Sequence, residues 1–171
     1  IPWIVFWDCD DFPHIREFLS LLNNTIESGA DVGIGSFDVR QRNSGKILNE
    51  FKNEISENLR YVHKIFPTPG LWRWVFKRSL IGELRFNKLQ IGEDALFLIE
   101  LEAFDKNIFI SSEIVYSYYV GDENQQTSKI SDPMRIAAIE AIDIARKHRK
   151  DNSKKFGMVI SNRLKLGRAT N

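Results

Sequence analysis

The first forty residues change their hydrophobic pattern twice. Residues 3–7, WIVFW, form a continuous apolar run rich in β-branched and aromatic side chains, which is typical of a central strand buried on both faces. Residues 13–27 place apolar side chains at helical spacing, with Pro13 in the predicted first turn. Residues 30–39 return to a loose strand pattern, and the RNSGK sequence that follows predicts a turn. Strand, helix and strand in this order predict an α/β sheet.

The rest of the chain carries further elements of both kinds. Periodicity predicts helices over residues 50–66 and 93–104 and a helical tail over residues 133–148, and it predicts strands over residues 107–111 and 114–120. Residues 71–81 are dense in aromatic side chains, and a strand followed by a short helix fits them, although periodicity alone does not decide.

Composition and charge indicate a soluble globular protein with one main core. The chain has 171 residues, of which 43% are apolar and 27% charged. Its 24 Lys and Arg nearly balance its 23 Asp and Glu, so no overall field favours nucleic acid. A single cysteine, Cys9, cannot form an internal disulfide, and we expect a cytoplasmic location. No apolar run approaches the roughly 20 residues that span a membrane.

Three carboxylates, Asp8, Asp10 and Asp11, follow directly after the first apolar run. Ligands of α/β sheets bind where strands end, and alternate residues of a strand face the same way, so Asp8 and Asp10 could share a hard divalent cation. The alternative is that Asp10 or Asp11 merely caps the following helix. Three neighbouring carboxylates repel one another and would be wasteful as a cap, which favours the metal site.

The same stretch resembles a known enzyme family. IVFWDCDD is similar to the apolar strand and Asp-x-Asp-Asp motif of family-two glycosyltransferases, which are inverting enzymes that use nucleotide sugars. Residues 68–101, with the aromatic LWRWVFKRSL segment and a later Gly-Glu-Asp, resemble the family's next conserved stretch. Residues 114–128, IVYSYYVGDENQQTS, resemble its closing strand and polar loop. The three segments occur in the family's order and span residues 4–128.

The resemblance implies an α/β protein of the A-type glycosyltransferase fold, with a mixed sheet and flanking helices. It implies that Asp10 binds Mn²⁺ or Mg²⁺ beside the donor diphosphate, with Asp8 near the ribose or the metal and Asp11 in support. It also implies that Asp94 is the general base, with Glu93 as the alternative holder of that role. The alternative for both residues is helix capping and pairing with the helix dipole.

Three further features bear on this interpretation. Trp72 beside a Pro-Gly loop is a candidate acceptor contact, and core packing is the equally reasonable alternative. The loop over residues 121–129 lacks the histidine with which many family members bind the metal. Asp122, Glu123 or Gln126 could substitute for it, or the metal site is weaker, so metal dependence stays open. The basic run over residues 145–155 fits a solvated helix end, or attraction to anionic lipid or a polyanionic glycan.

In this family the nucleoside is held largely by strands that precede the Asp-x-Asp strand. The chain opens at that strand and without Met, so we expect a piece of a longer protein that lacks the N-terminal nucleoside-binding part. The predicted organisation is a partial catalytic domain over residues 1–131 and a helical extension over residues 132–171. The predicted function is metal-dependent sugar transfer from a nucleotide-diphosphate sugar to a glycan or lipid-linked hydroxyl acceptor. The resemblance implies a UDP-linked donor, because that is the commonest donor in the family, and peripheral association with the membrane is part of the prediction.

Two other interpretations remain open at this point. The chain could be a catalytically incomplete domain that serves as a binding or assembly module. It could also be a haloacid-dehalogenase-like phosphatase, since these enzymes follow an apolar strand with Asp-x-Asp and use the first Asp as nucleophile. Such phosphatases usually carry Thr or Gly soon afterwards, whereas Asp11, Phe12 and Pro13 follow in this chain, which disfavours them.

Overall fold

The computed structural model describes residues 2–53, 70–89, 92–103 and 106–121, together with residues 132, 133, 136, 139 and 140. The chain divides into two compact units. The described part of the first unit comprises residues 2–53, 71–82 and 106–121, and that of the second comprises residues 70, 83–89, 92–103 and the five described residues of the tail.

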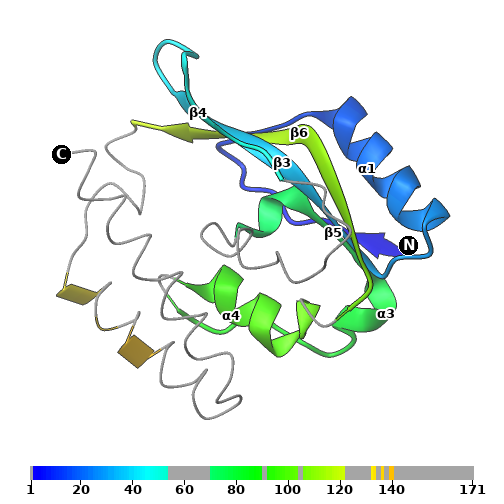
Figure 1. The fold of residues 1–171 in the computed structure, drawn as a ribbon. Helices are drawn as coiled ribbons and strands as arrows, with labels where there is room; N and C mark the ends of the chain where they lie inside the picture. Colours follow the sequence, from blue (N-terminus) through cyan, green and yellow to red (C-terminus); the bar gives the residue numbers. More distant parts are fainter. Residues whose placement is uncertain are drawn as a thin grey trace. The chain divides into compact units, whose positions relative to one another are not determined.

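The first unit is a mixed α/β structure built on one six-stranded sheet (Figure 1). Its strands run in the order β1-β5-β3-β6-β2, and β4 also pairs with β3. The strands are β1 (Trp3–Ile4), β2 (Phe12–Pro13), β3 (Val32–Gln41), β4 (Ile47–Phe51), β5 (Trp74–Lys77) and β6 (Ile108–Val120). The helical elements are α1 (Ile15–Glu27), the 3₁₀ turn η2 (Leu71–Arg73) and α3 (Arg78–Ile81).

The parallel pair β3 and β6 forms the centre of this sheet. Their register runs from Val32 opposite Ile108 to Gln41 opposite Val120, with irregularities between Ile34 and Phe37. On its other side β3 pairs antiparallel with β5 near its start and with β4 near its end. The strand β3 is therefore paired on both sides, and its residues 32–38 are all buried.

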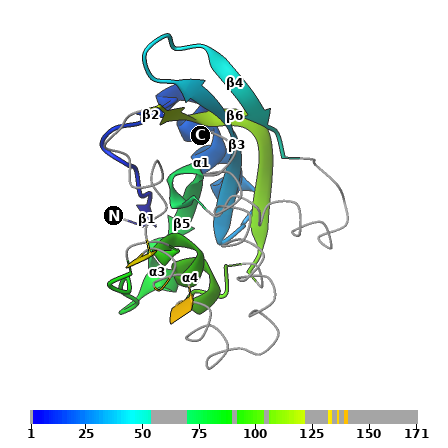
Figure 2. The same ribbon diagram turned by 90° about the vertical axis from the view of Figure 1, so that its left-hand side faces the viewer.

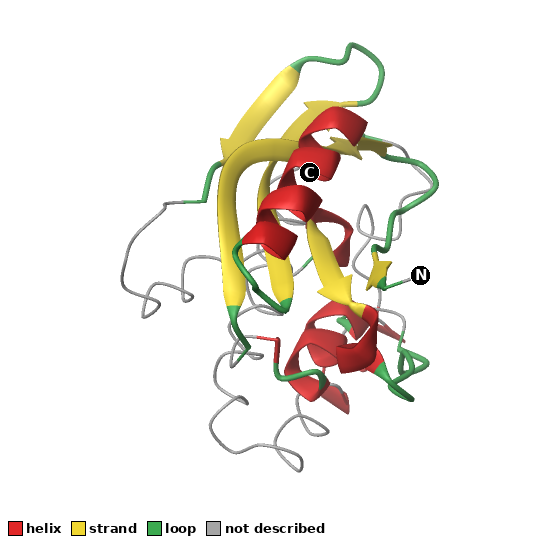
Figure 3. Cartoon of the chain, turned by 90° about the vertical axis from the view of Figure 1, so that its right-hand side faces the viewer, coloured by secondary structure: helices red, strands yellow, loops and turns green. Residues whose placement is uncertain are grey.

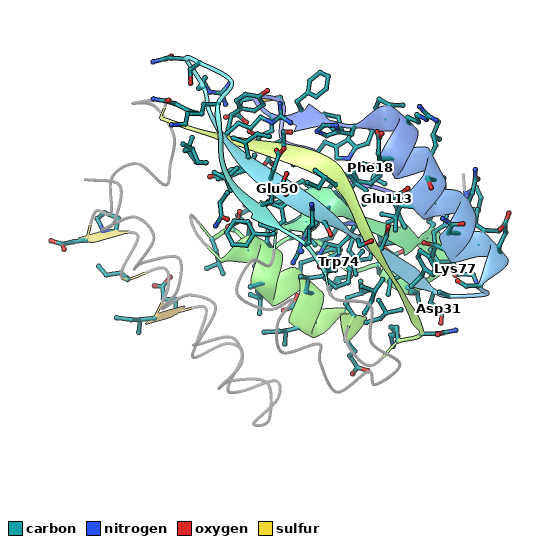
Figure 4. All side chains as sticks on the ribbon, turned by 45° about the horizontal axis from the view of Figure 1, so that its top comes forward. Phe18, Asp31, Glu50, Trp74, Lys77 and Glu113 are labelled. Atoms are coloured by element: carbon teal, nitrogen blue, oxygen red, sulfur yellow. The ribbon has the colours of Figure 1, made fainter. Side chains whose placement is uncertain are left out.

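Helix α1 covers one face of this sheet (Figure 3). Its buried side chains are Phe18, Leu21 and Thr25, spaced three and four apart. Phe18 and Leu21 join a core cluster with residues from η2, β3, β5 and β6, namely Phe37, Trp72, Val75, Val115 and Tyr116. Figure 4 marks Phe18 on the helix and Trp74, another fully buried ring, on β5.

The prediction of a central strand over residues 3–7 is wrong. Only Trp3 and Ile4 are in strand conformation, and β1 lies at the edge of the sheet, paired with β5 alone. Val5 is 36% exposed and Trp7 is 41% exposed. An apolar run favours burial of its side chains, but the pairing between strands determines which run lies at the centre of the sheet. In this chain the central strand is β3. The Trp7 ring instead packs edge-on against Phe18, with 5.2 Å between centroids.

Some of the other predicted strands and helices are confirmed, and others are wrong in their bounds. The strand predicted over residues 30–39 is confirmed as β3, and residues 71–81 do form a strand followed by a short helix. The two strands predicted over residues 107–120 are one continuous strand, β6. Pro13 lies in β2 rather than in the first turn of α1. The helix predicted over residues 50–66 is wrong at its start, where β4 extends to Phe51, and residues 54–66 lie outside the described part of the chain.

The second unit contains α4 (Glu93–Glu100), which begins where the sequence predicted it and ends earlier. Gly92 precedes it with a φ of 85°, a left-handed conformation that suits glycine. The rings of Phe86 and Phe97 stack with 4.6 Å between centroids, and the amide of Asn87 donates hydrogen bonds of 3.1 and 3.2 Å to the two carboxylate oxygens of Glu100.

The described tail residues are helical, and the predicted domain boundary between residues 131 and 132 stays a prediction. Among the residues with a described placement, no helix is both long and apolar enough to cross a membrane.

Gly35 of β3 generates a test of the central strand pair. A Cβ atom at Gly35 would lie 2.6 Å from Cγ1 of Val115, which is fully buried on β6. We expect Gly35→Ala to lower the free energy of unfolding by about 2 kcal/mol, because the methyl overpacks the core. Urea unfolding measures the change. Val115→Ala makes room for the added methyl, so in a double-mutant cycle the double variant should lose about 1 kcal/mol less unfolding free energy than the two single variants lose together. Strictly additive losses would contradict this.

Candidate functional site

The three sequence-predicted carboxylates lie at the carboxyl edge of the central strand pair. Parallel strands end at the same edge, and Arg42, which directly follows β3, donates its backbone N–H to the carbonyl of Val120 at the end of β6 (2.9 Å). Residues 5–11 form an irregular segment between β1 and β2, and β2 pairs with β6 by placing Phe12 opposite Ser117 (Figure 2). The carboxylates therefore reach this edge on a loop, not at the end of a central strand.

Asp11 is the carboxylate that the fold holds most tightly. Its side chain is 1% exposed, and its Oδ1 accepts a 2.9 Å hydrogen bond from the backbone N–H of Tyr119 on β6. Its Oδ2 is buried and has no hydrogen-bond partner among the described residues. Burial, together with the charges of Asp10 and Asp8, raises the pKa of Asp11 to about 6, against the lowering effects of the Tyr119 N–H and Arg42. A half-satisfied buried carboxylate of this kind is a common feature of functional sites.

Asp8 and Asp10 are the exposed members of the cluster. The backbone N–H of Asp8 donates to the phenol oxygen of Tyr116 over 3.2 Å, and the Asp10 side chain is 55% exposed. Burial raises the pKa of Tyr116, and the nearby charges of Asp11 and Asp8 raise it further, so this phenol keeps its proton at neutral pH. All three carboxylates therefore lie close enough to Tyr116 for their charges to raise its pKa.

Arg42 is the site residue that sequence reasoning missed. Its Nη2 donates a 2.7 Å hydrogen bond to the backbone carbonyl of Asp10 and lies 3.6 Å from Oδ2 of Asp10 and 3.8 Å from Oδ1 of Asp11. Its guanidinium also lies over the ring of Tyr119, 5.4 Å from the centroid. The available signal was its place at the start of the turn predicted after the strand over residues 30–39.

A buried polar chain holds β2 against the central strands. Asp38 of β3 binds Arg40 through Oδ2 and Nη2 at 2.8 Å. Burial works to raise the pKa of Asp38, but hydrogen bonds from Arg40 and the Ser117 hydroxyl hold it below its usual value. Nε2 of His14 lies 2.8 Å from the same hydroxyl. The chain fixes the segment that follows the three carboxylates.

Trp72 lies in the core of the first unit. It is 6% exposed, and its ring stacks on Tyr116 and Tyr118 with centroids 4.6 and 5.8 Å apart. This is the packing that the core alternative predicted. A contact between Trp72 and an acceptor stays a prediction.

Glu93 and Asp94 belong to the second unit, where they form the first turn of α4. Both are partly buried, and the helix dipole favours acidic residues there, as the capping alternative holds. Oε2 of Glu93 is buried without a hydrogen-bond partner among the described residues, which the dipole alone does not explain. The base role of either residue stays a prediction.

The described residues alone supply too few ligands to enclose a metal ion at the carboxylate cluster. Within the described residues, no group of three or more His, Cys, Asp or Glu side chains is arranged to hold a metal. Asp8 and Asp10 are both exposed and could each offer one oxygen. Mg²⁺ and Mn²⁺ commonly bind through one or two carboxylates together with water and substrate phosphates, so the residues present fit this open type of site. The sequence-predicted substitutes for a further ligand, Asp122, Glu123 and Gln126, lie outside the described residues.

Comparison with known proteins gives matches among solved structures only. No family model and no curated protein matches the chain. The structure of S. aureus TarS in complex with UDP-GlcNAc matches with a TM-score of 0.64 and 16% identity, over 98% of this chain and 50% of that one. The TarS structure with UDP matches with 0.55 and 19% over 82% and 40%, and TarS 1-349 matches with 0.56 and 16% over 98% and 48%.

TarS is a glycosyltransferase. The chain has a glycosyltransferase fold. It is an α/β fold with a mixed sheet and flanking helices, as the family resemblance implied. At this level of identity the likeness concerns the fold alone, and the chain spans about half the length of the TarS structure with UDP-GlcNAc.

The raised pKa of Asp11 predicts a pH-dependent stability. The folded pKa of about 6 lies above the ordinary value of 3.8, so the unfolded chain loses this proton first and stability falls as pH rises between the two values. Asp11→Asn cannot ionise and keeps an acceptor for the Tyr119 N–H. We expect its stability advantage over the parent chain to be small near pH 4 and to grow until about pH 6.

Urea unfolding with EDTA present measures this difference, and Glu27→Gln, at the exposed end of α1, is the control for loss of one carboxylate. An advantage of Asp11→Asn that stays constant across the pH range would contradict the assignment.

Proposed function

We propose that the chain is the catalytic part of an enzyme that transfers a sugar from a nucleotide-diphosphate sugar to a hydroxyl acceptor. The observation that carries the proposal is the glycosyltransferase fold with three carboxylates at its carboxyl edge, one of them buried with an unpartnered oxygen. The TarS structures with UDP-GlcNAc and UDP support a uridine nucleotide as donor. The acceptor is a surface polysaccharide or lipid-linked glycan, made at the inner face of the cytoplasmic membrane.

In this proposal Asp10 and Asp8 hold a divalent cation, Mn²⁺ or Mg²⁺, beside the donor diphosphate. When bound, the cation neutralises charge on the departing nucleotide diphosphate. Asp11 has a supporting role, because its hydrogen bond to Tyr119 ties the carboxylate loop to β6.

Asp94, or Glu93 in its place, accepts the proton of the acceptor hydroxyl. A neutral hydroxyl is a poor nucleophile, and removal of its proton during attack lets it displace the diphosphate in line at the anomeric carbon. The reaction inverts that carbon and needs no covalent intermediate with the enzyme. The partly buried environment of both carboxylates is compatible with such a base.

Asp10→Ala tests the donor site. We expect Mn²⁺-dependent binding of UDP to weaken at least tenfold, because one of two exposed carboxylate ligands is lost. Isothermal titration calorimetry with and without Mn²⁺ measures the change. Asp31→Ala, which removes a carboxylate paired with Lys77 beside the start of β3, is the matched control and should bind as the parent does (Figure 4). Equal Mn²⁺-dependent binding by Asp10→Ala and the parent would overturn the proposed site.

Asp94→Asn and Glu93→Gln test the base. Each substitution keeps the size of the side chain and removes its basicity, so the variant that replaces the base should keep UDP binding and lose at least 100-fold in turnover. Release of UDP from UDP-GlcNAc, with and without added glycan acceptors, measures turnover. If neither variant loses turnover, the base lies elsewhere. If the parent chain binds UDP but does not cleave UDP-GlcNAc, so that no UDP is produced, the chain is a binding module.

A further inference from the structure

Arg42 occupies the position of a counter-ion inside the carboxylate cluster. One nitrogen, Nη2, contacts the carbonyl of Asp10 at 2.7 Å, the carboxylate of Asp10 at 3.6 Å and that of Asp11 at 3.8 Å. The guanidinium is also held over the Tyr119 ring. One positive charge thus serves two carboxylates, one exposed and one buried.

The two ends of Arg42 are held very differently. Its backbone N–H is fixed to the carbonyl of Val120, so the residue itself is part of the sheet edge. Its side chain is 29% exposed, and its contact with the Asp10 carboxylate is the kind of surface ion pair that contributes little to stability. The guanidinium can therefore give up the 3.6 Å contact with the Asp10 carboxylate at small cost, while the backbone and the hydrogen bond to the Asp10 carbonyl stay in place.

We propose that Arg42 competes with the divalent cation for Asp10 and that the nucleotide diphosphate relieves this competition. This inference deepens the proposed function and rests on it. A cation bound to the Asp10 carboxylate would face a positive guanidinium on the same oxygen, and like charges disfavour each other. A diphosphate offers the guanidinium a second anionic partner, to which arginine binds well through its forked N–H groups.

The consequence is cooperative binding of the two ligands. Without nucleotide, Arg42 neutralises part of the cluster and weakens the binding of Mn²⁺. With nucleotide bound, Arg42 pairs with the diphosphate and Asp10 is left to the cation. Coupling between two ligands is reciprocal, so the factor by which UDP tightens Mn²⁺ binding equals the factor by which Mn²⁺ tightens UDP binding.

Arg42→Gln separates this inference from a simple binding role, because it predicts opposite changes for the two ligands. Mn²⁺ alone should bind roughly tenfold tighter to the variant, whereas UDP at saturating Mn²⁺ should bind roughly tenfold weaker. The electron paramagnetic resonance signal of free Mn²⁺ measures the first value, and calorimetry measures the second. Circular dichroism checks that the variant is folded.

Two further variants identify the cause. Arg42→Lys keeps the charge and loses the fork, so its affinity for Mn²⁺ alone should stay near that of the parent chain. Lys46→Gln removes a positive charge from the same β3–β4 hairpin, at a residue that makes no ion pair with the three carboxylates, and should change neither value by more than about twofold. If Lys46→Gln tightens Mn²⁺ binding as much as Arg42→Gln does, the effect is one of net charge and the inference is wrong.

The two proposals fail in different ways. If Mn²⁺ alone binds Arg42→Gln no tighter than it binds the parent, while Asp10→Ala still abolishes Mn²⁺-dependent UDP binding, the competition is overturned and the proposed function stands. If Asp10→Ala retains that binding, the proposed site fails and the competition fails with it.

Discussion

The parallel pairing of β3 with β6 is the interaction on which the rest of the first unit depends. It brings together the ends of two strands that are about eighty residues apart in the chain and so creates the edge at which residues 8–11 lie. Two hydrogen bonds near that edge, from the Tyr119 N–H to Asp11 and from the Arg42 N–H to Val120, attach the carboxylate loop and the arginine to the same strand. A shift in this register would separate the two.

The buried charged residues of the first unit differ in how fully their polar atoms are hydrogen-bonded. Asp38 is buried and well supplied with donors, and its pKa is low. Asp11 is buried too, but one of its oxygens has no hydrogen-bond partner among the described residues and its pKa is high. Arg73 is fully buried, its pKa lowered to about 9 by desolvation, and it contacts Oδ1 of Asn53 and the Phe37 ring. A half-satisfied carboxylate is costly to bury, and its position beside two exposed carboxylates fits a site that is completed by a ligand.

The likeness to TarS and the carboxylate cluster are independent lines of support. The fold likeness rests on backbone geometry at 16% identity and says nothing about which side chains act. The cluster rests on hydrogen bonds, burial and charge within this chain, and its Asp-x-Asp-Asp sequence was the starting point of the family resemblance. Together they make a donor-phosphate site the most economical account of this edge, which is the basis of the proposal.

The sequence alone determined that the chain is α/β and that residues 8, 10 and 11 are a candidate site, because apolar periodicity and carboxylate spacing are local properties. It also located α1 and β3 closely. Only the tertiary structure decided that residues 3–7 lie at an edge while β3 is central, since strand order depends on pairing between distant segments. For the same reason, the sequence did not identify Arg42 as a site residue. It is separated from Asp10 by about thirty residues and contacts it only because parallel strands end at the same edge.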